Sequence, residues 1–314
     1  MLKNAAFTLS ILIVVAIALA FPSLFLSIGN FELTGLIVPL LMIIMFGMGT
    51  SVGVADFVRV LKMPKSIAVG LGCQYTLMPM IGVALASASG LPPEIAVGMI
   101  LVGCAPGGLA SNVMAYISGA NLALSLSLTA FSTIIAPLTM PLLMSLLAGE
   151  HVPIHPIEMF WSITKMVLLP VCAGLLFNHY MHGKFPLLDR ALPLVSMGGI
   201  VIIIAVITAA GRDNLLSLGF ALIGFVALQN ILGLALGYGT AKLIRMDEAS
   251  ARSIAFEVGM QNSGLASGIA VEMGRVASMG IAPAVFGPIM NINGSILASY
   301  WRKSADSVRK GDND

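Results

Sequence analysis

The stretch Glu257-Val258-Gly259-Met260-Gln261-Asn262-Ser263-Gly264 places an acid and a run of polar and glycine residues inside an otherwise apolar, membrane-length segment. A carboxylate at mid-bilayer is costly, so it normally faces a cavity and pairs with a proton, a cation or a basic side chain. The glycines predict a helix break, which is tolerated at membrane depth where the freed backbone groups bind ions, substrate or buried partners. The stretch therefore predicts the centre of an ion-coupled transport site.

The composition is that of a membrane protein. Of the 314 residues, 58% are hydrophobic and 10% are charged, against about 25% charged in soluble domains. Long apolar runs recur along the whole chain and leave no room for a soluble domain. We predict an all-α polytopic protein with a single membrane domain, residues 1–314. The first run, 5–26, suits a membrane span better than a cleaved signal peptide.

We expect ten membrane spans of about 20 residues each. Their approximate ranges are 5–27, 33–52, 66–88, 93–118, 121–147, 157–178, 191–210, 215–243, 250–272 and 278–301. This count puts 13 of the 16 basic residues on one side. Those residues are Lys3, Arg59, Lys62, Lys65, Lys184, Arg190, Lys242, Arg245, Arg252, Arg302, Lys303, Arg309 and Lys310. The positive-inside rule then predicts two cytoplasmic termini, in the inner (plasma) membrane of the cell.

A short repeat supports two related halves, at about 1–149 and 150–314. Gly108-Leu109-Ala110-Ser111 recurs as Gly264-Leu265-Ala266-Ser267, 156 residues later. Both copies follow a helix-breaking stretch, Pro106-Gly107 in one and Asn262-Ser263 in the other, and five spans per half would make the halves inverted. Inverted repeats with interrupted helices in matching positions indicate a transporter's central site. The alternative interpretation is a pair of small-residue packing motifs.

Oxygen-bearing side chains in several spans accompany Glu257, the only acid near the middle of a span. They are Ser111, Asn112, Ser125, Thr129, Gln74, Gln261 and Asn262. A proton site needs one titratable group, whereas a hard cation takes several oxygen ligands. We therefore favour Na⁺ over a proton. Ser125 and Thr129 share a helix face, although each could instead hydrogen-bond to its own helix.

Other polar residues within spans have two interpretations each. Lys165 would either attract a substrate anion or extend to the membrane interface. Asn230, Asn291 and Asn293 would bridge helices or line a cavity, and Asn291 is the strongest cavity candidate.

Other classes of protein are disfavoured. The sequence has no HExxH, no GxSxG and no phosphate-binding glycine loop followed by lysine, which argues against an enzyme. A channel usually has a continuous pore rather than two broken helices around one acid. The basic residues lie in short loops as orientation signals, so we expect no nucleic-acid partner.

Three stretches, Ala105 to Val113, Asn121 to Thr133 and Glu257 to Gly264, together resemble the signatures of the bile acid:sodium symporter family. The bacterial members of this family resemble the apical sodium-dependent bile acid transporter, and the similarity runs over nearly the whole chain. The resemblance implies ten helices in two inverted five-helix repeats. A panel domain would hold spans 1, 2, 6 and 7, and a core domain spans 3–5 and 8–10. The fourth and ninth helices would break and cross.

The resemblance also implies ligands for two sodium ions, with no organic cofactor and no obligate protein partner. One site would use Ser111, Asn112, Ser125, Thr129 and Glu257. The other would use Gln74, Glu257 and Gln261, with the carbonyls of Val258 and Met260. A small organic anion would bind between panel and core, near the half-helix N-termini. Its candidate contacts are Gly108, Leu109, Asn262, Met290 and Asn291.

Two departures from close bacterial relatives bear on the substrate. Leu109 stands where threonine is frequent, and Met290 stands where a histidine often precedes the asparagine. Losing these polar groups changes which substrate groups the cavity can satisfy. We favour a small carboxylate such as pantoate or a related hydroxy or keto acid, with bile acids as incidental cargo. A proton-linked or uncoupled anion carrier, a bile-acid-type steroid transporter and a non-transporting sensor remain alternatives.

Overall fold

The computed structural model describes residues 2–51, 53, 63–181, 184 and 186–311, and these are almost entirely helical. Its elements are α1 (Leu2–Ala20), α2 (Ser23–Leu26), β1 (Ser27–Ile28), β2 (Phe31–Glu32), η1 (Leu33–Leu36), α3 (Ile37–Thr50), α5 (Pro64–Ala88), α6 (Pro93–Cys104), α7 (Leu109–Ile117), α8 (Leu122–Ala148), α9 (Pro156–Ile163), η2 (Thr164–Leu168), α10 (Leu169–Met181), α11 (Pro186–Ala210), α12 (Arg212–Leu243), α13 (Glu248–Gly259), α14 (Ser263–Glu272) and α15 (Ile281–Gly311). Arg59 and Lys62, used above to orient the chain, lie outside the described residues.

The helices have the length and composition of a multi-pass membrane protein. In the part of the chain that the structure describes, six helical segments are long and apolar enough to cross a membrane. They are 33–50, 64–88, 122–148, 156–181, 212–243 and 281–303. Three further apolar helices are shorter, at 10–20, 93–104 and 194–210. Many large apolar side chains remain exposed on the outside of the bundle, as lipid-facing positions require.

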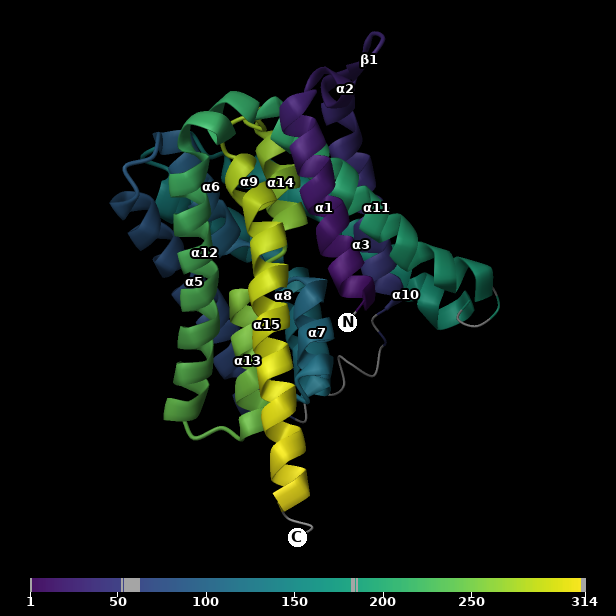
Figure 1. Ribbon diagram of the computed structural model, residues 1–314, viewed down its shortest axis with the longest axis vertical. Coiled ribbons are helices and arrows are strands. Elements are labelled where there is room, and N and C mark those ends of the chain that lie inside the picture. The colour runs from purple at the N-terminus through teal and green to yellow at the C-terminus, as the bar shows by residue number, and fades with distance from the viewer. Residues whose placement is uncertain (1, 52, 54–62, 182–183, 185, 312–314) are drawn as a thin grey trace.

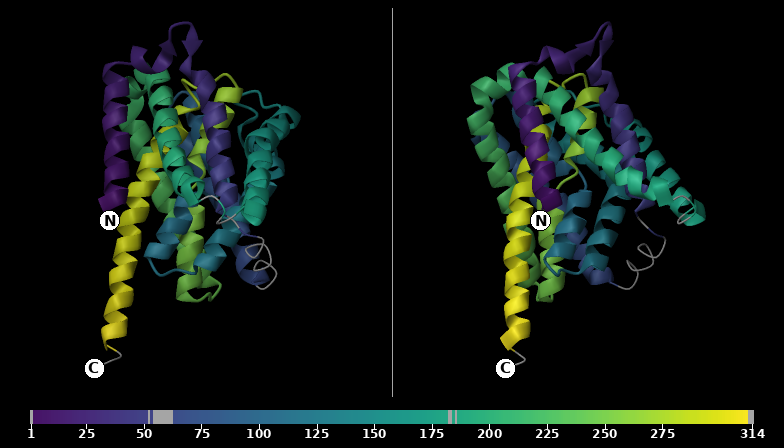
Figure 2. Two further views of the ribbon diagram at one scale, coloured as in Figure 1. Left: turned by 90° about the vertical axis from the view of Figure 1, so that its right-hand side faces the viewer. Right: turned by 45° about the vertical axis from the view of Figure 1, so that its right-hand side comes forward.

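The first predicted span ends earlier than expected. We placed its end at residue 27, but α1 stops at Ala20 and the chain continues through the short α2 into a two-stranded hairpin. Pro22 has no amide hydrogen, and it disfavours helical geometry in the preceding residue. The length of an apolar run does not show that a proline within it ends the helix. The hairpin lies at one end of the bundle, the C-terminus lies beyond the other end, and the N-terminus lies between them, toward the C-terminal side (Figures 1 and 2).

The helices pack in two groups. In one, α3 contacts α10 and α11, and α11 also contacts α1. In the other, α12 packs against α13, α5 and α15, while α7, α8 and α13 contact one another. The second group contains both places where an apolar segment is interrupted, α6 to α7 and α13 to α14. In Figure 1, α6 and α14 lie toward the hairpin end, and α7 and α13 lie toward the other. The two interrupted segments therefore run in opposite directions.

The two interruptions are hydrogen-bonded to each other. Pro106 follows Ala105, whose extended conformation ends α6, as expected for a residue before proline. Gly107 and Gln261 form an isolated antiparallel bridge. The Gly108 amide donates to the Met260 carbonyl at 2.8 Å, and the Asn262 amide donates to the Pro106 carbonyl at 2.8 Å. Backbone groups freed by both helix breaks are thereby satisfied inside the protein.

This pairing shifts the repeat seen in the sequence. In the two reciprocal hydrogen bonds, Gly108 and Asn262 hold equivalent positions, since each donates its amide to the other segment. These two residues are also the N-caps of α7 and α14. The tetrapeptide match paired Gly108 with Gly264 instead, two residues further on. The two copies of Gly-Leu-Ala-Ser therefore occupy different positions in their helices. Small residues are frequent near helix starts in a chain of this composition. An identical tetrapeptide can therefore occur at positions that are not equivalent in the structure.

Candidate functional site

Five of the predicted ligands form one hydrogen-bonded set next to the crossing. Ser111 Oγ and Thr129 Oγ1 donate to Glu257 Oε2 at 2.9 and 2.8 Å. Ser125 Oγ and Thr129 Oγ1 approach Asn112 Oδ1 at 2.8 and 3.3 Å. All five side chains are buried. Half-helix α7, the following helix α8 and half-helix α13 thus each contribute oxygens to one point.

The single hydroxyl proton of Thr129 has three acceptors within reach, and Glu257 Oε2 is the nearest of them, at 2.8 Å. The Thr129 hydroxyl lies 3.1 Å from the Ser125 carbonyl, which is the bond back to its own helix, and it also reaches Glu257 and Asn112. Ser125 differs, because its hydroxyl bonds Asn112 on α7. Spacing along one helix could not distinguish these outcomes, because the deciding partners lie on other segments of the chain.

The other oxygen of Glu257 is left without a donor. Glu257 is 1% exposed, and its Oε1 is buried with no hydrogen-bond partner among the described residues. A side chain at Gly107 would fill the space beside it, since an ideal Cβ there would lie 1.9 Å from this oxygen. A buried, unpartnered carboxylate oxygen costs free energy comparable to an unmade charged hydrogen bond. Glu257 Oε1, unlike Oε2, therefore lacks a hydrogen-bonding partner among the described residues.

The chemistry of this set fits a hard monovalent cation. It offers hydroxyl, amide and carboxylate oxygens, with a single formal negative charge, and no nitrogen or sulfur ligand is needed. In the described part of the chain, no cluster of three or more His, Cys, Asp or Glu side chains is suited to a metal ion. The oxygens of the set are held together by their own hydrogen bonds, so a cation would exchange those bonds for coordination.

The second predicted set is closed on itself. Gln74 Nε2 donates to Gln261 Oε1 at 2.6 Å and to the Ala105 carbonyl at 2.8 Å. Gln261 Nε2 in turn donates to the Val258 carbonyl at 2.5 Å and to Gln74 Oε1 at 3.3 Å. The Met260 carbonyl accepts the Gly108 amide in the crossing. Both amides would have to turn before their oxygens pointed at an ion.

All five predicted substrate contacts line one cavity between the two helix groups. Its wall on α1, α3 and α11 is apolar, and its wall on α7, α14 and α15 carries the polar groups. The predicted residues in this lining are Gly108, Leu109, Asn262, Met290 and Asn291. Ser263 and Ser267 also line it and were not predicted. Ser267 is the last residue of the second Gly-Leu-Ala-Ser copy, which we used only to define the halves.

Two helix N-termini face this cavity. Helix α7 begins with Gly108 as its N-cap, and α14 begins with Asn262, whose side chain accepts the Leu265 amide at 3.0 Å. The first amides of a helix have no partner within the helix, and the helix dipole makes this end positive. Anions therefore bind favourably there. The cavity thus has an apolar wall on one side and two positive helix ends on the other. This combination suits an organic anion with an apolar body.

A second cavity continues from the first toward the end of the bundle opposite the hairpin. The two share Leu109 and Ile200, and the second is also lined by Thr50 and Ser51 at the end of α3 and by Asn178 and Ser196. At the opposite end, Ser162 Oγ on α9 donates to Glu272 on α14 at 3.3 Å. The hairpin end thus holds a hydrogen bond between these helices and a further cavity, lined by Ser162, Glu272 and Arg275 among others.

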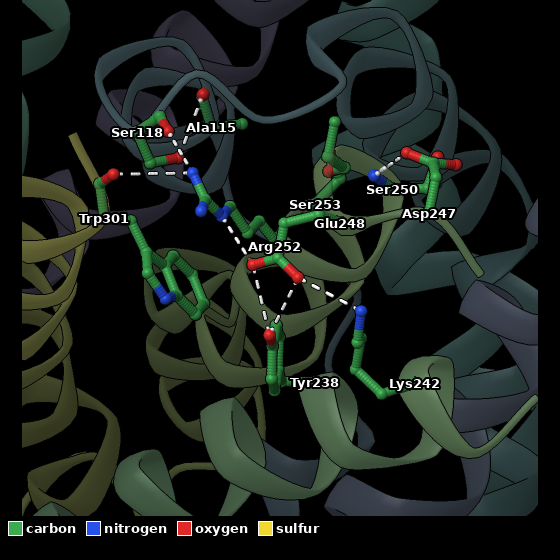
Figure 3. A network of polar contacts seen from close by, with 11 residues as sticks. Ala115, Ser118, Tyr238, Lys242, Asp247, Glu248, Ser250, Arg252, Ser253 and Trp301 are labelled. Atoms are coloured by element: carbon green, nitrogen blue, oxygen red, sulfur yellow. Dashed lines mark hydrogen bonds and ion pairs between the residues drawn. The ribbon is translucent and has the colours of Figure 1, made fainter. Parts of the chain in front are cut away.

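A polar brace holds the helices that carry the oxygen set (Figure 3). Arg252 of α13 donates from Nε to Glu248 at 2.9 Å and from Nη1 to the Ser118 carbonyl, just beyond α7, at 3.0 Å. Its guanidinium lies 5.4 Å from the ring centroid of Trp301 on α15. Glu248 also accepts from Tyr238 and Lys242 of α12. The sequence alone indicates only an orientation role for Arg252, because its partners Ser118 and Trp301 lie far away in the chain.

Two asparagines support the end of α13. Asn230 Nδ2 donates to the Gly259 carbonyl at 2.7 Å, and Asn293 Nδ2 donates to Asn230 Oδ1 at 2.8 Å. They bridge α12, α13 and α15, one of the two roles considered for them. Asn291 lines the cavity and donates to the Gly287 carbonyl of its own helix at 2.8 Å. Lys165 is exposed, and it is absent from the lining of the central cavity.

Comparison with known proteins identifies the family of this chain. The model of the Sodium Bile acid symporter family matches residues 38–218. An uncharacterized sodium-dependent transporter of Bacillus subtilis (strain 168), YocS, is 41% identical over 306 residues, covering 97% of this chain and 93% of the relative. Two chloroplastic proteins named probable sodium/metabolite cotransporter BASS1 are 36% identical in Oryza sativa and 35% identical in Arabidopsis thaliana.

The coverage differs between these relatives. The matches span 82% and 84% of this chain, but only 64% and 66% of the two plant proteins, which are longer. The family model alone covers more than half of the chain, and the Bacillus relative aligns over almost all of it. The chain belongs to the sodium bile acid symporter family.

Proposed function

We propose that this protein is a sodium-coupled secondary active symporter that imports a small organic anion by alternating access. The observation that carries the proposal is the buried Glu257, which accepts two hydroxyl hydrogen bonds through Oε2 and has no partner at Oε1. A sodium ion would supply the missing positive charge. The names of the relatives, which describe sodium-dependent transport and sodium/metabolite cotransport, support the same coupling ion.

We assign the first sodium ion to Ser111, Asn112, Ser125, Thr129 and Glu257. These oxygens already converge, so binding requires little rearrangement. A second ion would use Gln74, Glu257, Gln261 and the carbonyls of Val258 and Met260 after both glutamine amides turn. Because the second set is hydrogen-bonded internally, we expect it to fill after the first and with lower affinity.

The proposed architecture is ten spans in two inverted repeats. The interrupted pairs α6–α7 and α13–α14 would each count as one span, and the repeats would meet at their crossing. The panel would contain α1, α3, α9–α10 and α11, and the core would contain the rest. The separation into two packing groups supports this division. With cytoplasmic termini, the second cavity would lead from the substrate site to the cytoplasm.

Coupling would follow from the shared structure of the two sites. Asn262 and Gly108 begin the half-helices whose N-termini face the substrate cavity, and Ser111 and Glu257 lie within one turn of the same breaks. Filling the oxygen set with sodium would fix the half-helices and so prepare the anion site. Sodium and substrate would then favour the same conformation, and each would raise the affinity for the other.

We propose a small carboxylate, with pantoate and related hydroxy or keto acids as the first candidates. The carboxylate would lie at the N-termini of α7 and α14, and the apolar part of the acid would face α3 and α11. Leu109 and Met290 add no hydrogen-bonding side chain, but Asn262, Ser263, Ser267 and Asn291 line the same wall and would bind the hydroxyl or keto groups of such an acid. A steroid-type anion is the competing substrate class, because the apolar wall also suits a larger body.

Thermal unfolding of the purified protein tests both ion and substrate. A ligand that binds the folded state raises the apparent stability according to its occupancy. Pantoate, ketopantoate, pyruvate and taurocholate would each be added in sodium and in potassium at equal ionic strength. We expect stabilisation by one small acid in sodium only. Equal stabilisation in both salts would refute sodium coupling and favour a proton-linked or uncoupled carrier.

A further inference from the structure

A groove on the outer surface of the bundle lies between α12 and α15, away from the transport cavity. Its floor and walls are apolar or aromatic apart from the Asn293 amide and two tyrosine hydroxyls. The lining residues are Ile231, Leu234, Ala235, Tyr238, Asn293, Ile296, Leu297, Tyr300 and Trp301. Both flanking helices are long and apolar enough to cross a membrane. The groove therefore faces lipid.

The length of the groove matches one leaflet of a bilayer. Along α15 it extends from Asn293 to Trp301, which corresponds to about 12 Å at the helical rise of about 1.5 Å per residue. Half of the hydrocarbon core is about 15 Å thick. Tyr238, Tyr300 and Trp301 lie at the end of the groove nearer the C-terminus, and tyrosine and tryptophan are enriched at the membrane interface. An acyl chain in the groove would thus have its headgroup at this end.

Two lysines stand at that same end. Lys242 follows Tyr238 by four residues on α12, and Lys303 follows Tyr300 by three residues on α15. Residues three or four apart share a helix face, so each lysine continues the face that lines the groove. Both are exposed. Lys242 also contacts Glu248 at 3.2 Å, but this carboxylate is already neutralised by Arg252. The end of the groove therefore carries excess positive charge.

We infer that this groove binds an anionic phospholipid, with one acyl chain between α12 and α15 and the phosphate between Lys242 and Lys303. The groove wall is also the back of the brace in Figure 3, since Tyr238 donates to Glu248 and Trp301 stacks against Arg252. A bound lipid would pack against the aromatic side chains that hold α13. The inference depends on the membrane position of these helices and not on the proposed sodium coupling.

Lipid retention by the purified protein tests this site. Delipidated protein in detergent would be titrated with dioleoyl phosphatidylglycerol or dioleoyl phosphatidylcholine, and bound lipid counted by native mass spectrometry. We expect selective retention of one phosphatidylglycerol. Lys242→Gln and Lys303→Gln should each weaken that binding about fivefold, the effect of about one basic residue at a membrane surface. Lys165→Gln, an exposed lysine away from the groove, is the matched control and should change nothing.

A groove-filling variant separates a true lipid site from surface charge. Ala235→Trp should lower the retention of both lipids, because it occupies the space of the acyl chain. If wild type retained the two lipids equally, and the lysine variants had no effect, the site would hold only ordinary boundary lipid and the inference would be overturned. It would also be overturned if Ala235→Trp remained folded and retained phosphatidylglycerol normally. Size-exclusion profiles would verify that each variant is folded.

Discussion

Replacing Gly107 by alanine is predicted to disable the sodium site without touching any sodium ligand. An ideal Cβ at this position would lie 1.9 Å from Glu257 Oε1 and 2.5 Å from its Cδ, whereas ordinary contact begins at 3.4 Å. The carboxylate or the crossing must therefore shift by about 1.5 Å, the difference between 3.4 and 1.9 Å. The obstacle is the end of the Glu257 side chain, which is buried and hydrogen-bonded and so cannot move without losing those bonds.

Either movement breaks specific bonds. A shift of the carboxylate lengthens its hydrogen bonds from Ser111 and Thr129, now 2.9 and 2.8 Å, beyond hydrogen-bonding range. Hydrogen bonds to a charged group contribute about 1.5–3 kcal/mol each. In the sodium-bound state the hydroxyl oxygens of Ser111 and Thr129 would coordinate the ion beside the carboxylate, and we take each lost contact as equal to such a hydrogen bond. Losing two contacts amounts to about 3–6 kcal/mol, and since about 1.4 kcal/mol is tenfold in affinity, sodium binding should weaken by at least about 100-fold.

The assay is thermal unfolding of purified Gly107→Ala as a function of sodium, with potassium keeping the ionic strength constant. The half-saturating sodium concentration should rise by at least about 100-fold. Gly239→Ala is the matched control, because a Cβ there meets nothing within 4 Å, and its sodium response should equal that of wild type. Adding Glu257→Asp to Gly107→Ala shortens the acid by one methylene and should restore part of the response. An unchanged sodium response in Gly107→Ala would refute the reasoning.

Three further changes give distinct outcomes. Glu257→Gln should abolish stabilisation by sodium yet leave the melting temperature in potassium equal or higher, because it removes a buried charge of similar shape; a retained sodium effect in the same melts would contradict this. Arg252→Met should cost about 2–3 kcal/mol in chemical denaturation, equally with and without sodium, by leaving Glu248 and the Ser118 carbonyl without its donors; a loss confined to one salt would argue against a purely structural brace. Asn230→Leu should cost about 1–3 kcal/mol, and combining it with Asn293→Leu should cost less than the two single losses together, since each single change orphans the partner amide; additive losses would contradict the pairing.

The sequence predicted the features that polar, proline and glycine residues mark within apolar segments, namely the buried acid and the two helix breaks. Glu257 stood out because a mid-span acid is expensive, and Pro106 and Gly259 marked the interruptions of α6–α7 and α13–α14. The first oxygen set was assembled through family resemblance. Spacing along one helix could bring together only Ser125 and Thr129, and the contacts that unite the set join residues more than a hundred positions apart.

Contacts between residues that are distant in the sequence could not be predicted. Nothing adjacent to Gly107 in the sequence indicates that Glu257 packs against it, and nothing near Arg252 indicates Ser118 or Trp301 as partners. The two-residue shift between the tetrapeptide repeat and the paired N-caps has the same origin. Hydrogen bonds between Gly108 and Met260 and between Asn262 and Pro106 decide the alignment of the breaks, and side-chain identity does not.

The central claim is that an inward sodium gradient drives anion uptake through the site at Glu257. The direct measurement is uptake of the radiolabelled acid that stabilises the protein, into proteoliposomes containing wild type or Glu257→Gln, with external sodium or external potassium. The account predicts accumulation above the external concentration by wild type in sodium only, and none by Glu257→Gln in either salt. Equal uptake by wild type in potassium, or sodium-driven accumulation by Glu257→Gln, would contradict it.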